Sequence, residues 1–158
     1  MHAIYTRLSA EDEDSNSIKN QRFEGQQFAQ KNNIKKYKFY DEGEGISGGA
    51  NIDDRPQLKQ LISDINTGRI TSVWCRNQNR LERSQITFHF FVEVVKRMNI
   101  DVYFGDKLAD YNDASTYLQG SIISSINTYQ RQLQGQQTKK ALHNNVKMGK
   151  IQGMIPYG

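Results

Sequence analysis

Short apolar runs and amphipathic segments alternate along the first part of the chain. The short runs are rich in Val, Ile, Tyr and Phe, which is typical of strands. We expect strands at residues 1–8, 37–40, 70–75 and 102–104. We expect helices at residues 17–32, 54–68 and 84–98. Strands that alternate with helices predict an α/β fold with a mostly parallel central sheet and helices on both of its faces.

The segment between Asp54 and Gly68 has the clearest helical pattern. Its apolar residues are spaced so that they share one helical face: Leu58, Leu61, Ile62 and Ile65. We expect Asp54 to cap this helix, Pro56 to lie near its first turn and Gly68 to end it. A similar stripe marks the helix at 84–98: Phe91, Val94, Val95 and Met98.

A longer helical pattern fills the C-terminal part of the chain, from Ser115, which we expect to be its cap, to about Lys147. Its apolar residues define one face: Leu118, Ile122, Ile126, Tyr129 and Leu133. A helix of this length measures about 45 Å, more than the body of a small domain can cover. We therefore expect its apolar half to pack on a partner and its basic half to reach outward. The alternative is a helix that lies wholly on its own sheet.

The charge of the chain is unevenly distributed. The net charge is +4, but no Asp or Glu follows Asp113. The basic residues beyond that point are Arg131, Lys139, Lys140, Lys147 and Lys150. A basic segment without acids suits a polyanion such as double-stranded DNA, whose phosphates supply most of the non-specific affinity. The alternative is a solvated basic helix without a partner.

Ser9 is the candidate nucleophile, because of the residues that precede it in the first strand. Side chains two and four residues apart in a strand share a face, so Tyr5 and Arg7 would lie beside the Ser9 hydroxyl. Ile4 and Leu8 would point into a core. We therefore expect the nucleophile on a surface that is already cationic.

Arginines recur in the segments that an α/β fold would bring near Ser9. They are Arg7 on the same strand, Arg55 after the glycine-rich segment 41–54, and Arg80 with Arg83 after the third strand. Ligand-facing residues of such folds collect at the carboxyl ends of strands, where Ser9 and Arg80 both fall. The guanidinium group contacts two phosphate oxygens at once and stays charged. A serine among arginines points to a phosphodiester; for Arg55 and Arg83, a surface salt bridge is the alternative.

Other catalytic patterns are missing from the sequence. The histidines His2, His89 and His143 have no triad-like spacing, and neither a Cys and His cluster for zinc nor a phosphate-loop motif occurs. We therefore expect no cofactor. Three acids, Asp41, Glu42 and Glu44, leave a magnesium site open against the alternative of solvated carboxylates.

Cys75 is the single cysteine and lies in an apolar run, so we expect a buried strand residue and not a reactive thiol. No apolar run approaches the roughly 20 residues that span a bilayer. The N-terminus lacks a signal-peptide pattern. These features predict a soluble, cytoplasmic protein.

Six short motifs follow one another along the chain: Tyr5-Thr6-Arg7-Leu8-Ser9, Ser17-Ile18-Lys19-Asn20-Gln21, Tyr40-Asp41-Glu42-Gly43, Ile46-Ser47-Gly48, Asp54-Arg55-Pro56 and Asn79-Arg80-Leu81-Glu82-Arg83-Ser84. Together they resemble the catalytic domain of serine recombinases, in the resolvase and invertase superfamily. The wide gap between Ser9 and Gln21 is similar to that of the large serine integrases. Residues 149–158 are similar to the junction at which such large recombinases enter their DNA-binding domain.

This resemblance implies a three-layer resolvase-like fold and a site-specific recombinase that works without a cofactor. Ser9 would attack a DNA phosphate to give a 5′-phosphoserine link and a free 3′-hydroxyl. The roles implied for the other residues are phosphate binding for Arg7, Arg80 and Arg83, support for Arg55, orientation through hydrogen bonds for Gln21, and packing for Tyr5. The implied partners are double-stranded DNA and further copies of the chain, as a dimer and in a tetramer.

The resemblance also implies a division of the chain. Residues 1–113 would form the catalytic core, 114–147 a helix for oligomerisation and DNA contact, and 148–158 a linker toward a C-terminal DNA-binding domain. Asn79 departs from the family pattern, since most members have an aspartate there. An amide keeps hydrogen bonding but loses the negative charge, and we expect Asn79 still to contact the arginines.

Two other functions stay open. A catalytically weak DNA-binding or assembly module of the same fold would accommodate Asn79. A flavodoxin-like or receiver-like signalling domain would account for the alternating strands and helices, but it leaves the arginines unexplained. The motifs specify neither the target DNA sequence nor a choice between integration, excision and inversion.

Overall fold

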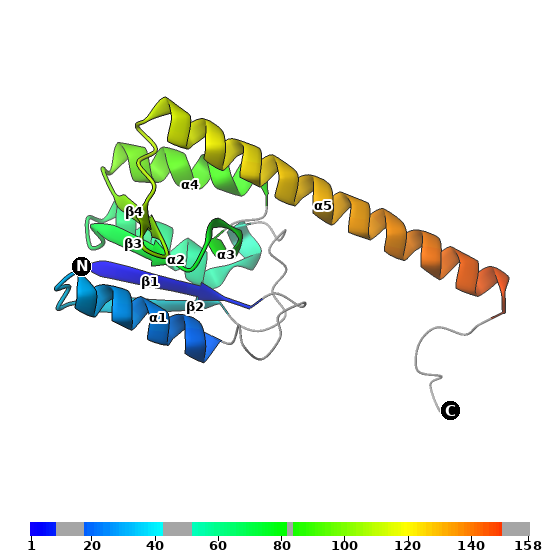
Figure 1. Cartoon of the computed structure of the whole chain (residues 1–158), viewed down its shortest axis with the longest axis horizontal. Helices are drawn as coiled ribbons and strands as arrows, with labels where there is room; N and C mark the ends of the chain where they lie inside the picture. Colours follow the sequence, from blue (N-terminus) through cyan, green and yellow to red (C-terminus); the bar gives the residue numbers. More distant parts are fainter. Residues whose placement is uncertain (9–17, 43–51, 82–83, 150–158) are drawn as a thin grey trace.

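The computed structural model describes residues 1–8, 18–42, 52–81 and 84–149. A five-stranded sheet lies at its centre, in the order β2-β1-β3-β4-β5 (Figure 1). The strands are β1 (His2–Arg7), β2 (Tyr37–Glu42), β3 (Ser72–Cys75), β4 (Asp101–Phe104) and β5 (Lys107–Leu108). β1 to β4 are parallel, and β5 pairs antiparallel with β4. The prediction of a mostly parallel sheet is confirmed.

Helices cover the sheet on both faces, which makes three layers (Figure 1). The helices are α1 (Ile18–Lys31), η2 (Ile52–Asp54, a 3-10 helix), α2 (Pro56–Asn66), α3 (Gln78–Leu81), α4 (Gln85–Arg97) and α5 (Ala114–Lys147). α1 lies on one face, where Phe28 packs with Ile4 and Trp74. On the other face, α2 and α4 bury the main core against the strands. The expected α/β architecture is therefore present.

β1 is buried along its whole length and on both of its faces. Ile4 belongs to the core under α1, whereas Ala3 and Tyr5 belong to the core under α2 and α4. The expected alternation of side chains is correct, but the expected cationic surface is wrong, because Tyr5 and Arg7 are fully buried. A central parallel strand has helices over both faces, so neither face is left to solvent.

Two expected helix caps are wrong. Asp54 belongs to η2, and Arg55 precedes the first turn of α2. The cap of α5 is Asp113 and not Ser115, since the Asp113 carboxylate accepts a hydrogen bond from the Thr116 amide at 2.7 Å. Asp and Ser are both common caps, so residue type does not decide between neighbouring positions. Two further elements, α3 and β5, were not predicted, because their four and two residues are too short to show a period.

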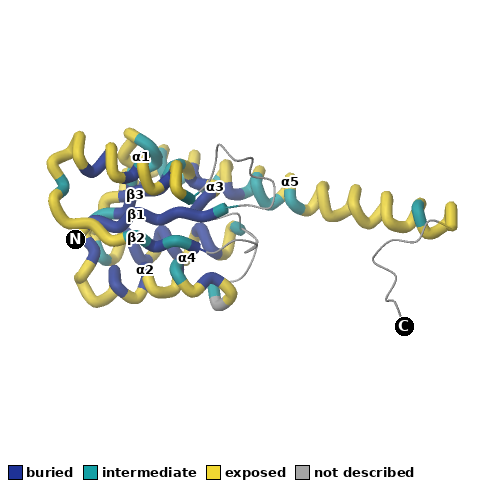
Figure 2. Tube along the Cα trace, turned by 90° about the horizontal axis from the view of Figure 1, so that it is seen from below, coloured by how far each residue is buried: buried dark blue, intermediate teal, exposed yellow. Residues whose placement is uncertain are grey.

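α5 is 34 residues long, yet Gly120 and Ser124 are its only buried residues. Its first turns pack on α4, and the rest extends away from the body of the domain (Figures 1 and 2). The alternative in which the helix lies wholly on its own sheet is therefore wrong. The expected apolar face is exposed, with Leu118 at 59% and Tyr129 at 64%. Neither α5 nor another helix in the described ranges is long and apolar enough to cross a membrane.

Candidate active site

Two of the expected site residues meet where β1 and β3 end. The strands pair in parallel, so the segments that follow them share the carboxyl edge of the sheet. Arg7 ends β1, and its Nε and Nη2 donate to the carbonyls of Arg80 (3.0 Å) and Asn79 (2.7 Å) in α3. Its Nη1 donates to the Leu8 carbonyl at 3.1 Å. Arg7 therefore ties the segment that carries Arg80 to the chain immediately before Ser9.

Gln21 holds the same end of β1 from the side of α1. Its Nε2 donates to the Arg7 carbonyl at 3.0 Å, and its Oε1 accepts from the Arg7 amide at 3.3 Å. The Gln21 side chain is fully buried. The buried carboxamide of Gln21 and the buried backbone N–H and carbonyl of Arg7 thus satisfy each other. This pairing directs Gln21 at the backbone that leads to Ser9, and the orienting role expected for Gln21 stays a prediction.

Tyr5 and Arg55 bond to each other, and Arg55 also bonds to the backbone of α3. The Tyr5 hydroxyl donates to Glu42 Oε2 at 2.6 Å and accepts from Arg55 Nη2 at 2.5 Å. The same Nη2 donates to the Leu81 carbonyl at 2.6 Å. Burial raises the pKa of the Tyr5 phenol above its ordinary value, against the opposing effect of Arg55, so Tyr5 stays neutral. The expected surface salt bridge of Arg55 is wrong, because its side chain is fully buried.

Glu42 is a site residue that the sequence analysis missed. It is fully buried, 3.7 Å from Arg55 Nε, and its carboxylate accepts from the amides of Gln57 and Leu58 at 3.1 Å each. Glu42 therefore caps the N-terminus of α2, although it lies at the end of β2. A carboxylate at this end of a helix also complements the helix dipole. For Glu42, the two alternatives from the sequence, a solvated carboxylate and a magnesium ligand, are both wrong. The sequence offered no signal for this role, because Glu42 and Gln57 are 15 residues apart.

The Asn79 side chain does not turn toward the arginines. Its Oδ1 accepts a hydrogen bond from Asn127 Nδ2 on α5 at 2.7 Å. The Asn79 carbonyl, by contrast, accepts from Arg7. The expected contact between Asn79 and the arginine cluster is thus made by backbone. Asn127 was missed, because 48 residues separate it from its partner.

The described part of this region carries an excess of positive charge. Arg7 and Arg55 are fully buried and donate to carbonyls of α3, and Arg80, which lies on α3, is 8% exposed. Of the buried carboxylates in the described residues, Glu42 lies here, whereas Asp64 binds Lys38 and Arg69 elsewhere. Guanidinium groups in excess suit an anion with several oxygens, such as a phosphate.

Cys75 ends β3 beneath this cluster and is fully buried, as predicted. Burial raises the pKa of its thiol to about 12, although Arg7, Arg55 and Arg80 lie near enough to oppose the shift. The thiol therefore stays protonated at neutral pH and is a poor nucleophile.

Some expected site residues lie outside the described residues: Ser9, Arg83, Glu44 and Lys150. The other basic residues of the C-terminal part lie on α5. Lys139, Lys140 and Lys147 are exposed, and Arg131 is half-buried. They occupy the part of α5 that extends from the domain (Figure 1). Among the residues described, no group of three His, Cys, Asp or Glu side chains could hold a metal ion.

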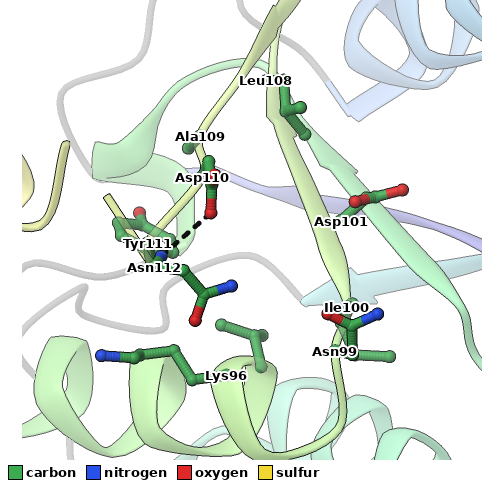
Figure 3. A pocket seen from close by; sticks show the side chains of 10 residues that line it. Lys96, Asn99, Ile100, Asp101, Leu108, Ala109, Asp110, Tyr111 and Asn112 are labelled. Atoms are coloured by element: carbon green, nitrogen blue, oxygen red, sulfur yellow. Dashed lines mark hydrogen bonds between the residues drawn. The ribbon is translucent and has the colours of Figure 1, made fainter. Parts of the chain in front are cut away.

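A pocket of about 190 Å³ opens at the other end of the sheet, between α4 and the start of β4 (Figure 3). Its charged lining residues are Lys96, Asp101 and Asp110. The Asp110 carboxylate accepts from the Asn112 amide at 2.9 Å. Two carboxylates against one ammonium do not favour a phosphate, so this pocket is separate from the arginine cluster in place and in charge.

Comparison with a protein family gives a match over nearly the whole chain. The family described as "Resolvase, N terminal domain" matches residues 2–151. Among curated proteins, none matches the chain.

Solved structures also resemble the chain. The N-terminal catalytic domain of TP901-1 integrase is 28% identical, with a TM-score of 0.63 over 84% of this chain and 98% of that one. A resolvase family site-specific recombinase from Streptococcus pneumoniae is 18% identical, with a TM-score of 0.57 over 92% and 97%. The C-terminal catalytic domain of ISC1926 TnpA, an IS607-like serine recombinase, is 21% identical, with a TM-score of 0.55 over 93% and 96%. The last two share the fold.

Proposed function

The chain belongs to the resolvase family of serine recombinases, and we propose that it cleaves and rejoins DNA through Ser9. The Ser9 Oγ attacks a backbone phosphorus, and the bond from that phosphorus to the 3′-oxygen breaks. The serine proton passes to the departing 3′-oxygen, which leaves a 5′-phosphoserine link and a free 3′-hydroxyl. Attack by a 3′-hydroxyl on the phosphoserine reverses the step, so the bond energy is conserved.

The observation that carries this proposal is that Arg7 and Arg55 donate to the carbonyls of Arg80 and Leu81 at the carboxyl end of β1, and that both lie with Arg80 near the buried Cys75 thiol. Negative charge builds on the phosphate oxygens during the attack, and fixed guanidinium groups stabilise it. We assign phosphate binding to Arg7, Arg80 and Arg83, with Arg55 in support.

The extended part of α5 is proposed to contact DNA. Lys139, Lys140 and Lys147 are exposed there, and Arg131 lies nearer the domain. No acid follows Asp113 to oppose their charge. Cations along a projecting helix suit the phosphates of a duplex, with an affinity that falls as salt rises. We propose the same role for Lys150, which lies outside the described residues.

The first half of α5 is proposed to meet a second copy of the chain. Its exposed apolar residues are Leu118, Ile122, Ile123, Ile126, Tyr129 and Leu133. Exposed apolar residues along one helix mark an interaction surface. A second copy fits because recombination cuts both strands of a duplex, which takes one serine nucleophile for each strand.

Capture of a covalent adduct tests the proposed reaction. The full-length protein is incubated with a library of nicked duplexes of random sequence, and complexes that survive denaturation are digested and analysed by mass spectrometry. The wild-type protein should yield a phosphoserine peptide that contains Ser9. Ser9→Ala should yield none, whereas Ser115→Ala, which removes an exposed hydroxyl from α5, should keep the adduct. A wild-type protein that binds duplexes without an adduct would instead be a non-catalytic DNA-binding module.

A further inference from the structure

α5 docks on the domain through a narrow seam of small and polar residues. Gly120 and Ser124 are buried, and Asn127 follows on the same helical face. A Cβ atom at Gly120 would lie 2.9 Å from Phe88 Cζ, so α5 approaches α4 too closely for a side chain at this position. Most long apolar side chains of α5 are exposed, but Tyr117 packs on the core and its ring lies against Phe88 and His89 of α4. Hydrogen bonds act together with this aromatic contact in setting where the helix lies.

Three amide side chains donate hydrogen bonds across this seam. Gln78 Nε2 donates to the Gly120 carbonyl at 2.8 Å, and Asn127 Nδ2 donates to Asn79 Oδ1 at 2.7 Å. Gln85 Nε2, at the start of α4, donates to Ser125 Oγ at 2.5 Å. The first two bonds attach α5 to adjacent residues of α3. Asn79 directly precedes Arg80, and Gln78 lies one residue earlier.

Asn79 is the point where contacts from α5 and from β1 meet. Its side chain accepts from Asn127, and its carbonyl accepts from Arg7. Because α3 has only four residues, its own backbone hydrogen bonds fix it weakly, and contacts from neighbouring elements decide its position. The position of α5 is thereby transmitted to the backbone of Arg80.

We propose that Asn127 is a positioning residue for the cleavage reaction, which acts through Asn79 to hold Arg80 in place. The role of Arg80 rests on the function proposed above, whereas the effect of Asn127 on α3 does not. α5 is also the helix proposed to meet a second copy. Assembly and the position of Arg80 are therefore linked through the two hydrogen bonds between α5 and α3, of which the one from Asn127 reaches the residue directly before Arg80.

The first test needs no DNA. Amide hydrogen exchange is followed by NMR in Asn127→Ala, in Asn79→Ala and in the double variant. Loss of one hydrogen bond should speed exchange at residues 78–81 by roughly threefold to tenfold in Asn127→Ala. The second substitution should add little, because both remove the same bond. Unchanged exchange in β1 shows that the fold is intact, and Asn112→Ala, which truncates an exposed asparagine away from the seam, should resemble the wild type.

The second test measures the rate of adduct formation on the duplexes recovered in the capture experiment. Asn127→Asp and Asn79→Asp should each react at close to the wild-type rate, because the remaining amide can turn to donate to the new carboxylate. The two substitutions together place two carboxylates in contact and should slow the reaction by more than tenfold. A purely structural role for either residue would not produce this dependence on charge.

Two results would overturn the inference. One is exchange at residues 78–81 that Asn127→Ala leaves unchanged. The other is faster exchange without slower adduct formation, which would mean that the position of α3 does not limit the reaction. If no protein yields an adduct, the proposed function fails, and the exchange measurement still decides whether Asn127 holds α3.

Discussion

Gln21 and Arg7 are joined by two hydrogen bonds, which the buried Gln21 carboxamide makes with the backbone N–H and the carbonyl of Arg7. Gln21 lies on α1, and Arg7 ends β1, so a helix fixes the strand at the point where the chain leaves the sheet toward Ser9. Removal of the carboxamide would leave both a donor and an acceptor of the Arg7 backbone without these partners. Gln21 therefore contributes to the stability of the fold as well as to the direction of the chain before Ser9.

Gln21→Ala should lower the free energy of unfolding by about 2 kcal/mol, since the buried backbone N–H and carbonyl of Arg7 each lose a hydrogen bond. Urea denaturation followed by circular dichroism measures this loss. Gln27→Ala is the matched control, because Gln27 lies on the same helix but is exposed, and it should change stability by less than about 0.5 kcal/mol. Equal stabilities for the two variants would show that the pairing of Gln21 with Arg7 contributes nothing.

Glu42→Gln should destabilise the protein by about 3 kcal/mol, because the substitution leaves the Arg55 guanidinium buried without its carboxylate. The amide also replaces an anion at the N-terminus of α2. Thermal denaturation should show a correspondingly lower melting temperature. The control is Glu93→Gln on α4, since Glu93 is exposed; a Glu42→Gln protein as stable as this control would contradict the role assigned to the buried carboxylate.

The central elements of the fold could be predicted from the sequence because their signals are local. Leu58, Leu61, Ile62 and Ile65 repeat within one helix and are all buried on one face of α2. The apolar runs that form β1 and β3 can likewise be recognised without reference to distant residues. The cap of α2 could not be predicted in the same way, because it comes from Glu42, which β2 brings to the helix.

The candidate site divides along the same line. Arg7, Gln21, Arg55 and Arg80 could be named from motifs, and the structure brings them together. Their contacts could not be predicted, because several of them are made with backbone carbonyls of α3, a helix too short to show a period. The pairing of Asn79 with Asn127 depends on where α5 crosses α3. No spacing in the sequence encodes that crossing.

His2 should make the stability of the protein depend on pH. It is buried, its Nδ1 lies 2.7 Å from Ser72 Oγ, and burial with the N-terminal ammonium lowers its pKa from 6.5 to about 4. Between these values the unfolded chain binds a proton that the folded protein rejects, so stability falls as pH drops from about 6.5 to about 4. The full loss is about 3 kcal/mol.

Urea denaturation at several pH values measures this effect. In His2→Gln the loss between about pH 6.5 and 4 should largely vanish, since no imidazole remains to titrate. His89→Gln serves as the control, because His89 is exposed, and should retain the wild-type dependence. Asp64, whose pKa is lowered chiefly by hydrogen bonds from Lys38 and Tyr40, should add a further loss only as the pH falls through its ordinary range near 3.8. A His2→Gln protein with the wild-type pH profile would contradict the assignment.

Gly25 and Gly135 should respond to alanine in opposite directions, although both lie inside helices. A Cβ at Gly25 would lie 2.5 Å from Ile4 Cγ2 and 3.0 Å from Trp74 Cε3, so Gly25→Ala should push α1 off the sheet and cost about 1–3 kcal/mol. At Gly135 no atom lies within 4 Å of such a Cβ. There the better helix propensity of alanine should stabilise α5 by up to about 1 kcal/mol.

Urea denaturation and the helical signal in circular dichroism measure the two effects. Because the same substitution is made in both helices, a difference in sign isolates the space around each glycine from the propensity of the residue. If Gly25→Ala stabilised the protein, α1 would have to lie farther from Ile4 and Trp74 than the packing of Phe28 against these two residues allows. A destabilising Gly135→Ala in the isolated protein would mean that α5 has a close neighbour at this position, and measurement at increasing protein concentration would identify a second copy as that neighbour.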